Sequence, residues 1–204
     1  MAEIRELYIS VDVEADGPYP NPYSMVSLGA AVAGYKDVDG RIVRIDVENS
    51  EFNDTFYVEF KPLTDHWVEE SLAVSGLNRK DLEENGIMPE KGMTNFAQWV
   101  EEKTSAYECK TAVFCAFPLG FDWMWVYWYL MKFSATGSPF GHSRCLDIKT
   151  LYMAKANSTL TRSTKVNMPK ILRSRKPHTH NALDDAIEQG ELMINIMEWQ
   201  GKQK

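Results

Sequence analysis

The sequence predicts one α/β domain built around a mixed β-sheet. Its first part is typical of several strands joined by hairpin-like turns, and its second part alternates between helical and strand-like segments. The 204 residues suit one domain of ordinary size, and no Pro/Gly/Ser-rich linker or internal repeat divides them. We therefore expect residues 1–204 to form a single domain.

The first strand is the clearest element of the first part. Leu7–Val13 alternates in polarity and is rich in β-branched residues, and Asp16-Gly17 with three nearby prolines then forces a loop. Small and β-branched residues predict the strands that follow. These are expected at Met25–Gly34, Arg41–Val47 and Phe56–Phe60.

A short apolar run marks the centre of the second part. Thr111–Ala116 is typical of a buried, parallel strand, and Arg144–Ile148 is a candidate for the last strand. Apolar residues at helical spacing predict the remaining elements, with Thr94 as a candidate N-cap. The expected helices are Asp65–Val74, Arg79–Asn85, Thr94–Tyr107, Phe121–Met131, Lys149–Ala156 and Asn181–Trp199.

The composition is that of a globular protein, with 44% hydrophobic and 25% charged residues. No apolar run is long enough to span a bilayer, so we expect no membrane association. The first residues include acids and enter a strand pattern at once, which is not typical of a signal peptide. The three cysteines lack metal-ligand spacing and are expected to be reduced thiols, so we expect a cytoplasmic protein.

Charge is unevenly distributed along the chain. The net charge of −7 argues against a protein that coats long duplexes with a broad basic face. Residues 148–183 nevertheless contain no Asp or Glu. This segment either captures a phosphate chain locally or is a solvated loop with a chance bias in charge. Its cations are Lys149, Lys155, Arg162, Lys165, Lys170, Arg173, Arg175 and Lys176.

Two carboxylates close the first predicted strand. Asp12 and Glu14 are two residues apart, so their side chains point to the same face of the strand. Paired carboxylates repel each other, and a hard divalent cation such as Mg²⁺ or Mn²⁺ removes that cost. The alternative is an exposed strand end with ordinary surface acids.

A third carboxylate lies in an apolar segment. Asp122 is the only acid between Glu108 and Asp147, at the start of a helix that is otherwise built for the core. A functional acid and a helix-capping residue both fit this position, since Asp favours the first turn of a helix.

The entrance of the last helix combines a histidine with acids. His180 precedes the helix and Asp185 lies in its second turn, so both side chains can face the same opening. Acids also stabilise a helix N-terminus, which is the alternative explanation. That alternative does not account for Ala182 and Ala186, which leave room for a neighbour beside Asp185.

Together these residues resemble the three exonuclease motifs of the DEDD superfamily of 3′–5′ exonucleases. The motifs appear in order as Asp12-x-Glu14, Gly120-Phe121-Asp122 and His180-x₄-Asp185. The last spacing resembles the histidine-bearing (DEDDh) branch, which includes ribonuclease T, oligoribonuclease and polymerase proofreading subunits. The resemblance covers nearly the whole chain and extends most closely to small single-domain bacterial and phage exoribonucleases.

The resemblance implies an RNase H-like fold, with a mixed sheet of five or six strands flanked by helices. It also implies two Mg²⁺ or Mn²⁺ ions held by Asp12, Glu14, Asp122 and Asp185. His180 can take a proton from water, because an unperturbed imidazole has a pKa of about 6.5. His178 is the alternative base. Substrate contacts are expected from Val13, Arg173, Arg175, Lys176 and His178.

One residue departs from the family pattern. Ala116 stands roughly where many members have an Asn shortly before the middle Asp. This change removes no metal ligand, but it can alter how the attacking side of the site is organised.

The leading hypothesis is a metal-dependent exonuclease that hydrolyses phosphodiester bonds at the 3′ end of single-stranded RNA or DNA, with RNA favoured. One alternative is a phosphodiesterase that acts on dinucleotides or very short oligonucleotides. Another is a catalytically inactive nucleic-acid-binding module of the same fold. The expected partner is the 3′ end of a single strand, and the resemblance to small exonucleases also suggests a homodimer.

Overall fold

A mixed β-sheet forms the centre of the protein. The computed structural model describes residues 5–49 and 54–201. Within them the sheet has six strands in the order β3-β2-β1-β5-β6, with β4 also paired to β2. The β1–β5 and β5–β6 pairs are parallel and the other pairs are antiparallel, which confirms the predicted mixed sheet. The strands are β1 (Glu6–Ala15), β2 (Met25–Lys36), β3 (Ile42–Arg44), β4 (Thr55–Glu59), β5 (Thr111–Ala116) and β6 (Cys145–Asp147).

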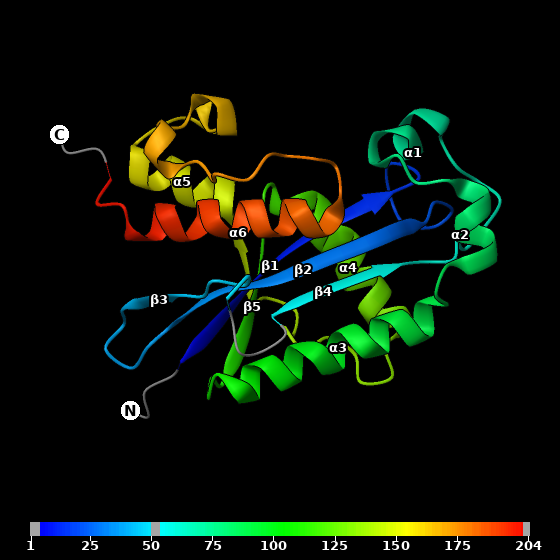
Figure 1. The fold of residues 1–204 in the computed structure, drawn as a ribbon, viewed down its shortest axis with the longest axis horizontal. Coiled ribbons are helices and arrows are strands. Elements are labelled where there is room, and N and C mark those ends of the chain that lie inside the picture. The colour runs from blue at the N-terminus through cyan, green and yellow to red at the C-terminus, as the bar shows by residue number, and fades with distance from the viewer. Residues whose placement is uncertain (1–4, 50–53, 202–204) are drawn as a thin grey trace.

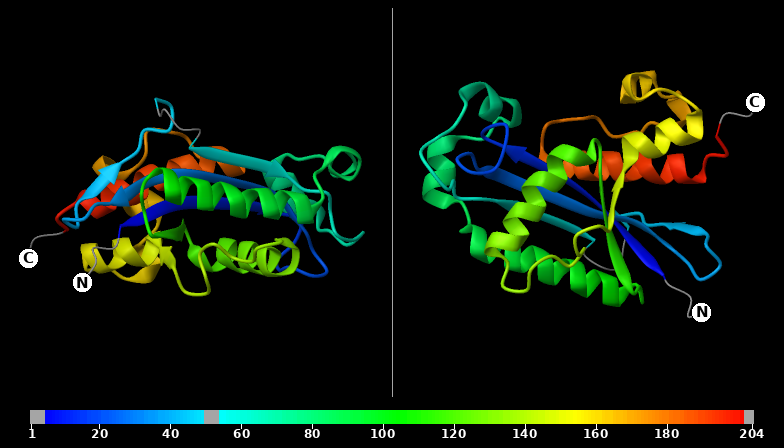
Figure 2. Two further views of the ribbon diagram at one scale, coloured as in Figure 1. Left: turned by 90° about the horizontal axis from the view of Figure 1, so that it is seen from below. Right: turned by 180° about the vertical axis from the view of Figure 1, so that it is seen from behind.

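Helices cover both faces of this sheet. Figures 1 and 2 show α6 on one face and α3 with α4 on the other. Short 3₁₀ helices follow α5 and pack beside the C-terminal half of α6. The helices are α1 (Glu69–Ser75), α2 (Arg79–Asn85), α3 (Pro89–Ala106), α4 (Leu119–Phe133), α5 (Ile148–Ala156) and α6 (Ala182–Glu198). No helix within the described ranges combines the length and hydropathy that a bilayer crossing requires.

The alternation of β1 sorts its side chains between two cores. Ile9 and Val11 are fully buried in the core that contains Phe96 of α3 and Trp125 of α4. Tyr8 points the other way, into the core built by α5 and α6. Because side chains alternate along a strand, the even-numbered positions further along β1 also face α6.

Two glycines let α6 lie close to the sheet. Gly29 pairs with Asp12 across β1 and β2, and a Cβ at Gly29 would lie 2.2 Å from the backbone of Ala182. A Cβ at Gly190 would lie 3.1 Å from the Cβ of Ser10. The first contact allows no side chain at all, so Gly29 brings the N-terminal turn of α6 directly over Asp12.

The start of α3 differs from the prediction. The helix begins at Pro89, five residues before Thr94, so Thr94 lies inside the helix and is not its N-cap. Proline is favoured at the first helical position because its missing N–H is not needed there. The hydroxyl of Thr94 instead accepts a hydrogen bond from the Ala135 backbone N–H at 3.1 Å.

Candidate active site

Three of the predicted acids meet between β1 and α6. Asp12 and Glu14 extend from β1 toward α6, and Asp185 lies in the first turns of that helix with 1% of its surface exposed. One carboxylate oxygen from each of the three lies within 4.8 Å of the others. This is the arrangement that the strand alternation predicts for Asp12 and Glu14, and the close approach of α6 adds Asp185.

The fourth acid reaches the same place from the opposite face of the sheet. Asp122, in the first turn of α4, is 3% exposed and accepts a hydrogen bond from the Val13 backbone N–H at 3.1 Å. The ladder between β1 and β5 ends at Ser10, so the Val13 N–H on that side has no strand partner. Asp122 therefore bonds across to β1 as well as to its own backbone N–H, and a role confined to the start of α4 does not explain the bond to β1.

Burial and neighbouring carboxylates raise the pKa values of Asp12, Glu14 and Asp122. Burial, and then the neighbouring acids, hold the pKa of Asp12 well above its ordinary range. Burial is also the largest cause at Glu14, where the nearby Asp185 contributes and the pKa is about 7, and at Asp122, where it is about 8. Closely spaced, partly desolvated carboxylates are costly unless a cation joins them. An all-oxygen donor set of this kind fits hard divalent cations.

A loop at the N-terminus of α6 holds Asp185 in place. The backbone N–H groups of Thr179 and His180 donate to its two oxygens at 2.9 and 3.0 Å. The Nδ1 atom of His178 lies 2.9 Å from Oδ2 of the same carboxylate. His180 adopts a left-handed backbone with φ of 60°, and its ring centroid lies 4.4 Å from that of His178. Both histidines are therefore at the exposed mouth of the acid cluster.

Gln189 is a site residue that the sequence analysis missed. Its side chain is 1% exposed and donates to the Val11 carbonyl at 2.9 Å and to Oδ1 of Asp12 at 3.4 Å. Its Oε1 accepts from the Phe117 backbone N–H at 2.8 Å. One amide thus joins β1, the turn after β5 and α6. The available signal was its position four residues after Asp185, which puts both on one face of the helix.

Lys165 is a second missed residue, although the basic segment that contains it was noted. It pairs with the buried Glu188 of α6, and its Nζ lies 5.5 Å from the centre of the Phe117 ring. Its charge lowers the pKa values of Asp12 and Asp122, against the larger upward effect of burial. Lys165 is therefore the cation of the basic segment that acts electrostatically on the acid cluster.

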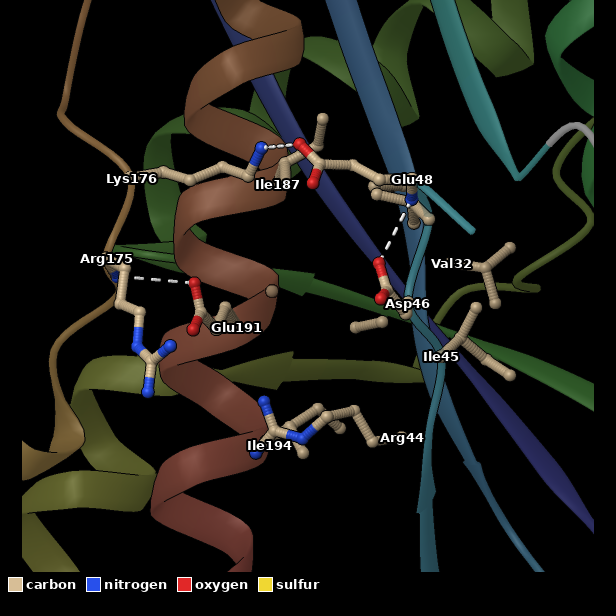
Figure 3. Close-up of a pocket in the computed structure, with 14 residues that line it drawn as sticks. Val32, Arg44, Ile45, Asp46, Glu48, Arg175, Lys176, Ile187, Glu191 and Ile194 are labelled. Carbon is tan, nitrogen blue, oxygen red and sulfur yellow. Dashed lines mark hydrogen bonds and ion pairs between the residues drawn. The ribbon is translucent and has the colours of Figure 1, made fainter. Parts of the chain in front are cut away.

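The side chains of the other predicted substrate contacts lie away from the acid cluster, apart from that of His178. Val13 is buried in the core, and Arg173 donates to backbone carbonyls of its own segment, including Met168 at 2.8 Å. Arg175 and Lys176 line a cavity of about 380 Å³ between α6 and β3, on the other flank of the helix. Figure 3 shows Lys176 paired with Glu48 and the Arg175 backbone N–H donating to Glu191. The structure does not bring these side chains into the acid cluster.

Comparisons with known proteins place this arrangement in a wider context. No protein-family model matches the chain. The 3′-5′ DNA exonuclease Cap18 of Escherichia coli is 31% identical over 202 residues, which cover 98% of this chain and 96% of that protein. The nuclease domain of 3′hExo, a DEDDh family member bound to rAMP, has a TM-score of 0.63 at 11% identity and covers 98% of this chain and 96% of its own. Escherichia coli exonuclease I in complex with a dT13 oligonucleotide has a TM-score of 0.55 at 11% identity, over 95% of this chain and 40% of that one.

The two kinds of similarity support different conclusions. The solved structures share the overall fold, which confirms the RNase H-like sheet that the three motifs predict. The similarity to Cap18 extends over nearly the full length of both sequences. The chain therefore belongs to the DEDDh family of 3′–5′ exonucleases, which are hydrolases that act on phosphodiester bonds.

Proposed function

We propose that this exonuclease removes nucleotides from the 3′ ends of single-stranded DNA, using Asp12, Glu14, Asp122 and Asp185 to hold two Mg²⁺ or Mn²⁺ ions. The observation that supports this proposal is the convergence of carboxylates from β1, α4 and α6, together with the raised pKa values of Asp12, Glu14 and Asp122. We further propose that residues 1–204 act as one exonuclease domain. A homodimer stays a prediction.

The chain's own groups divide the work of hydrolysis. When bound, two divalent cations supply an activated water and stabilise the leaving 3′ oxygen. Gln189 and the Val13 N–H fix the orientations of Asp12 and Asp122 through the hydrogen bonds described above. His180 accepts the proton of the attacking water, because imidazole takes up protons near neutral pH and the exposed ring stands at the mouth of the cluster.

The choice between DNA and RNA rests on the relatives. Cap18, which resembles this chain over its whole length, is named a DNA exonuclease, and this supports DNA. The 3′hExo neighbour was solved with rAMP, but at 11% identity it is similar in fold alone. RNA, which the sequence analysis favoured, is therefore the second candidate.

The test is a time course on 5′-labelled single-stranded DNA and RNA of matched sequence. With Mg²⁺ or Mn²⁺ we expect stepwise shortening from the 3′ end, faster on DNA than on RNA. Internal cuts alone, or equal rates in a chelator, would contradict the proposal. Addition of an unlabelled dinucleotide tests the short-substrate alternative. Strong inhibition of the cleavage of longer strands by the dinucleotide would favour a phosphodiesterase that acts on very short substrates.

A further inference from the structure

The histidine loop before α6 forms a second group of potential metal ligands. Nitrogen atoms of His178 and His180 and an oxygen of Asp185 all lie within 4.8 Å of one another. We propose that these three residues form a binding site for Zn²⁺ that is distinct from the all-carboxylate cluster and shares only Asp185 with it.

The distances suit zinc with little rearrangement. Zn²⁺ binds imidazole nitrogen and carboxylate oxygen at about 2.0–2.2 Å, so neighbouring ligands of a tetrahedral site lie about 3.4 Å apart. The Nδ1 atom of His178 and Oδ2 of Asp185 already lie 2.9 Å apart. A Zn²⁺ ion can therefore take the place of the hydrogen between them, and rotation of the exposed His180 ring supplies the third ligand.

The two sites have different types of ligand atom, so we expect them to prefer different metal ions. Imidazole nitrogen favours Zn²⁺ and similar transition metals, whereas carboxylate oxygens favour Mg²⁺ and Mn²⁺. The side chain of His178 is 48% exposed while that of Asp185 is 1% exposed, so an ion can enter from solvent and still have a fixed carboxylate ligand. Three protein ligands leave the fourth position open to water, as in many zinc sites.

Sharing of Asp185 makes the two sites antagonistic. A Zn²⁺ ion on the loop draws away the carboxylate that also belongs to the group with Asp12 and Glu14. It also occupies the imidazole of His180. Inhibition by Zn²⁺ follows from this, and that consequence rests on the proposed function, whereas zinc binding itself does not.

The primary test is calorimetric titration of the metal-free, full-length protein with Zn²⁺. We expect one Zn²⁺ bound to the wild type, and at least tenfold weaker binding in His178→Ala. His142→Ala is the matched control, because it removes another exposed histidine far along the chain and should bind Zn²⁺ like the wild type. Absence of Zn²⁺ binding to the wild type, or unchanged binding in His178→Ala, would overturn the proposal.

A spectroscopic measurement distinguishes loss of a ligand from a change in folding. Co²⁺ in the wild type should give visible absorption typical of nitrogen ligands and low coordination number, and His178→Ala should lose these bands while melting at the wild-type temperature. Weak bands typical of six oxygen ligands in the wild type would contradict the site. If the exonuclease assay fails but these titrations succeed, the proposed function is wrong and the zinc site stands.

Discussion

The two flanks of α6 carry charge in different ways. On the flank of Asp185, acids from three elements meet and the pKa values of Asp12, Glu14 and Asp122 are raised. On the flank of the cavity beside β3, acids have partners: Glu48 pairs with Lys176, as Figure 3 shows. In this cavity Arg44 is likewise paired, with Glu198. Uncompensated buried charge is the better indicator of a site that needs a cation.

The largest expected effect comes from a pair of neighbouring acids on α6. Asp185→Asn removes a carboxylate from the buried cluster and should lower kcat by about 10³-fold or more. Asp184→Asn is the matched control, since Asp184 is exposed and its side chain accepts a hydrogen bond from the Thr179 hydroxyl at 3.1 Å. We expect it to retain activity within about threefold. Steady-state kinetics on labelled single strands measure both, and equal losses would remove the distinction between the two positions.

A smaller effect is expected from the amide that orients the cluster. Gln189→Leu keeps the volume but loses the hydrogen bonds to Asp12 and to the turn after β5, so the outer support of the metal ligands is lost. Such supports change metal affinity or activity by about 10–100-fold. Two measurements distinguish loss of this support from a folding defect: the Mn²⁺ affinity, determined by calorimetry, and kcat. Gln98→Leu, on the exposed side of α3, should match the wild type in both measurements, and a wild-type Mn²⁺ affinity in Gln189→Leu would contradict the positioning role.

The smallest effect on activity and stability is expected from a substitution beside the cavity between α6 and β3. Arg44→Ala removes an exposed ion pair with Glu198 and a hydrogen bond to Asn195. Exposed pairs of this kind contribute about 0.2–1 kcal/mol, so the free energy of unfolding should fall by no more than that and kcat/KM should not change. Denaturant unfolding and kinetics test this. A tenfold loss of kcat/KM would show that the cavity flank takes part in substrate binding.

Local sequence patterns predicted the bounds of a helix or strand well where residues of that element alone set its ends. The apolar run Thr111–Ala116 and the helix Arg79–Asn85 have the predicted bounds. The alternation of β1 likewise placed Asp12 and Glu14 on one face. The start of α3 was predicted wrongly, because Thr94 was the predicted N-cap whereas the helix begins at Pro89.

Contacts between distant parts of the chain could not be predicted in the same way. Gln189 bonds to Val11 and Phe117, which are 178 and 72 residues away in sequence. Arg173 was expected to contact substrate, but its guanidinium satisfies the carbonyls of a turn whose conformation no local pattern reveals. Lys165 stood among eight similar cations, and only the packing of its segment beside α6 distinguishes it.

The melting temperature of the metal-free protein as a function of pH tests the central claim most directly. Because the pKa values of Asp122 (about 8) and Glu14 (about 7) are raised in the folded state, ionisation of these groups lowers the free energy of unfolding. That stability returns as the pH falls through these two pKa values toward the lower pKa values of the unfolded chain. We therefore predict that the melting temperature rises as the pH falls from above 8 to about 6, by about 2–4 °C for each kcal/mol gained in the free energy of unfolding.

Excess Mg²⁺ or Mn²⁺ completes this measurement. Added above pH 8, either ion should raise the melting temperature of the wild type by binding the folded state, and should do so far less for Asp12→Asn. A metal-free protein that is equally stable or less stable near pH 6, together with no shift on adding Mg²⁺ or Mn²⁺, would contradict the claim that these four carboxylates form a site for divalent cations.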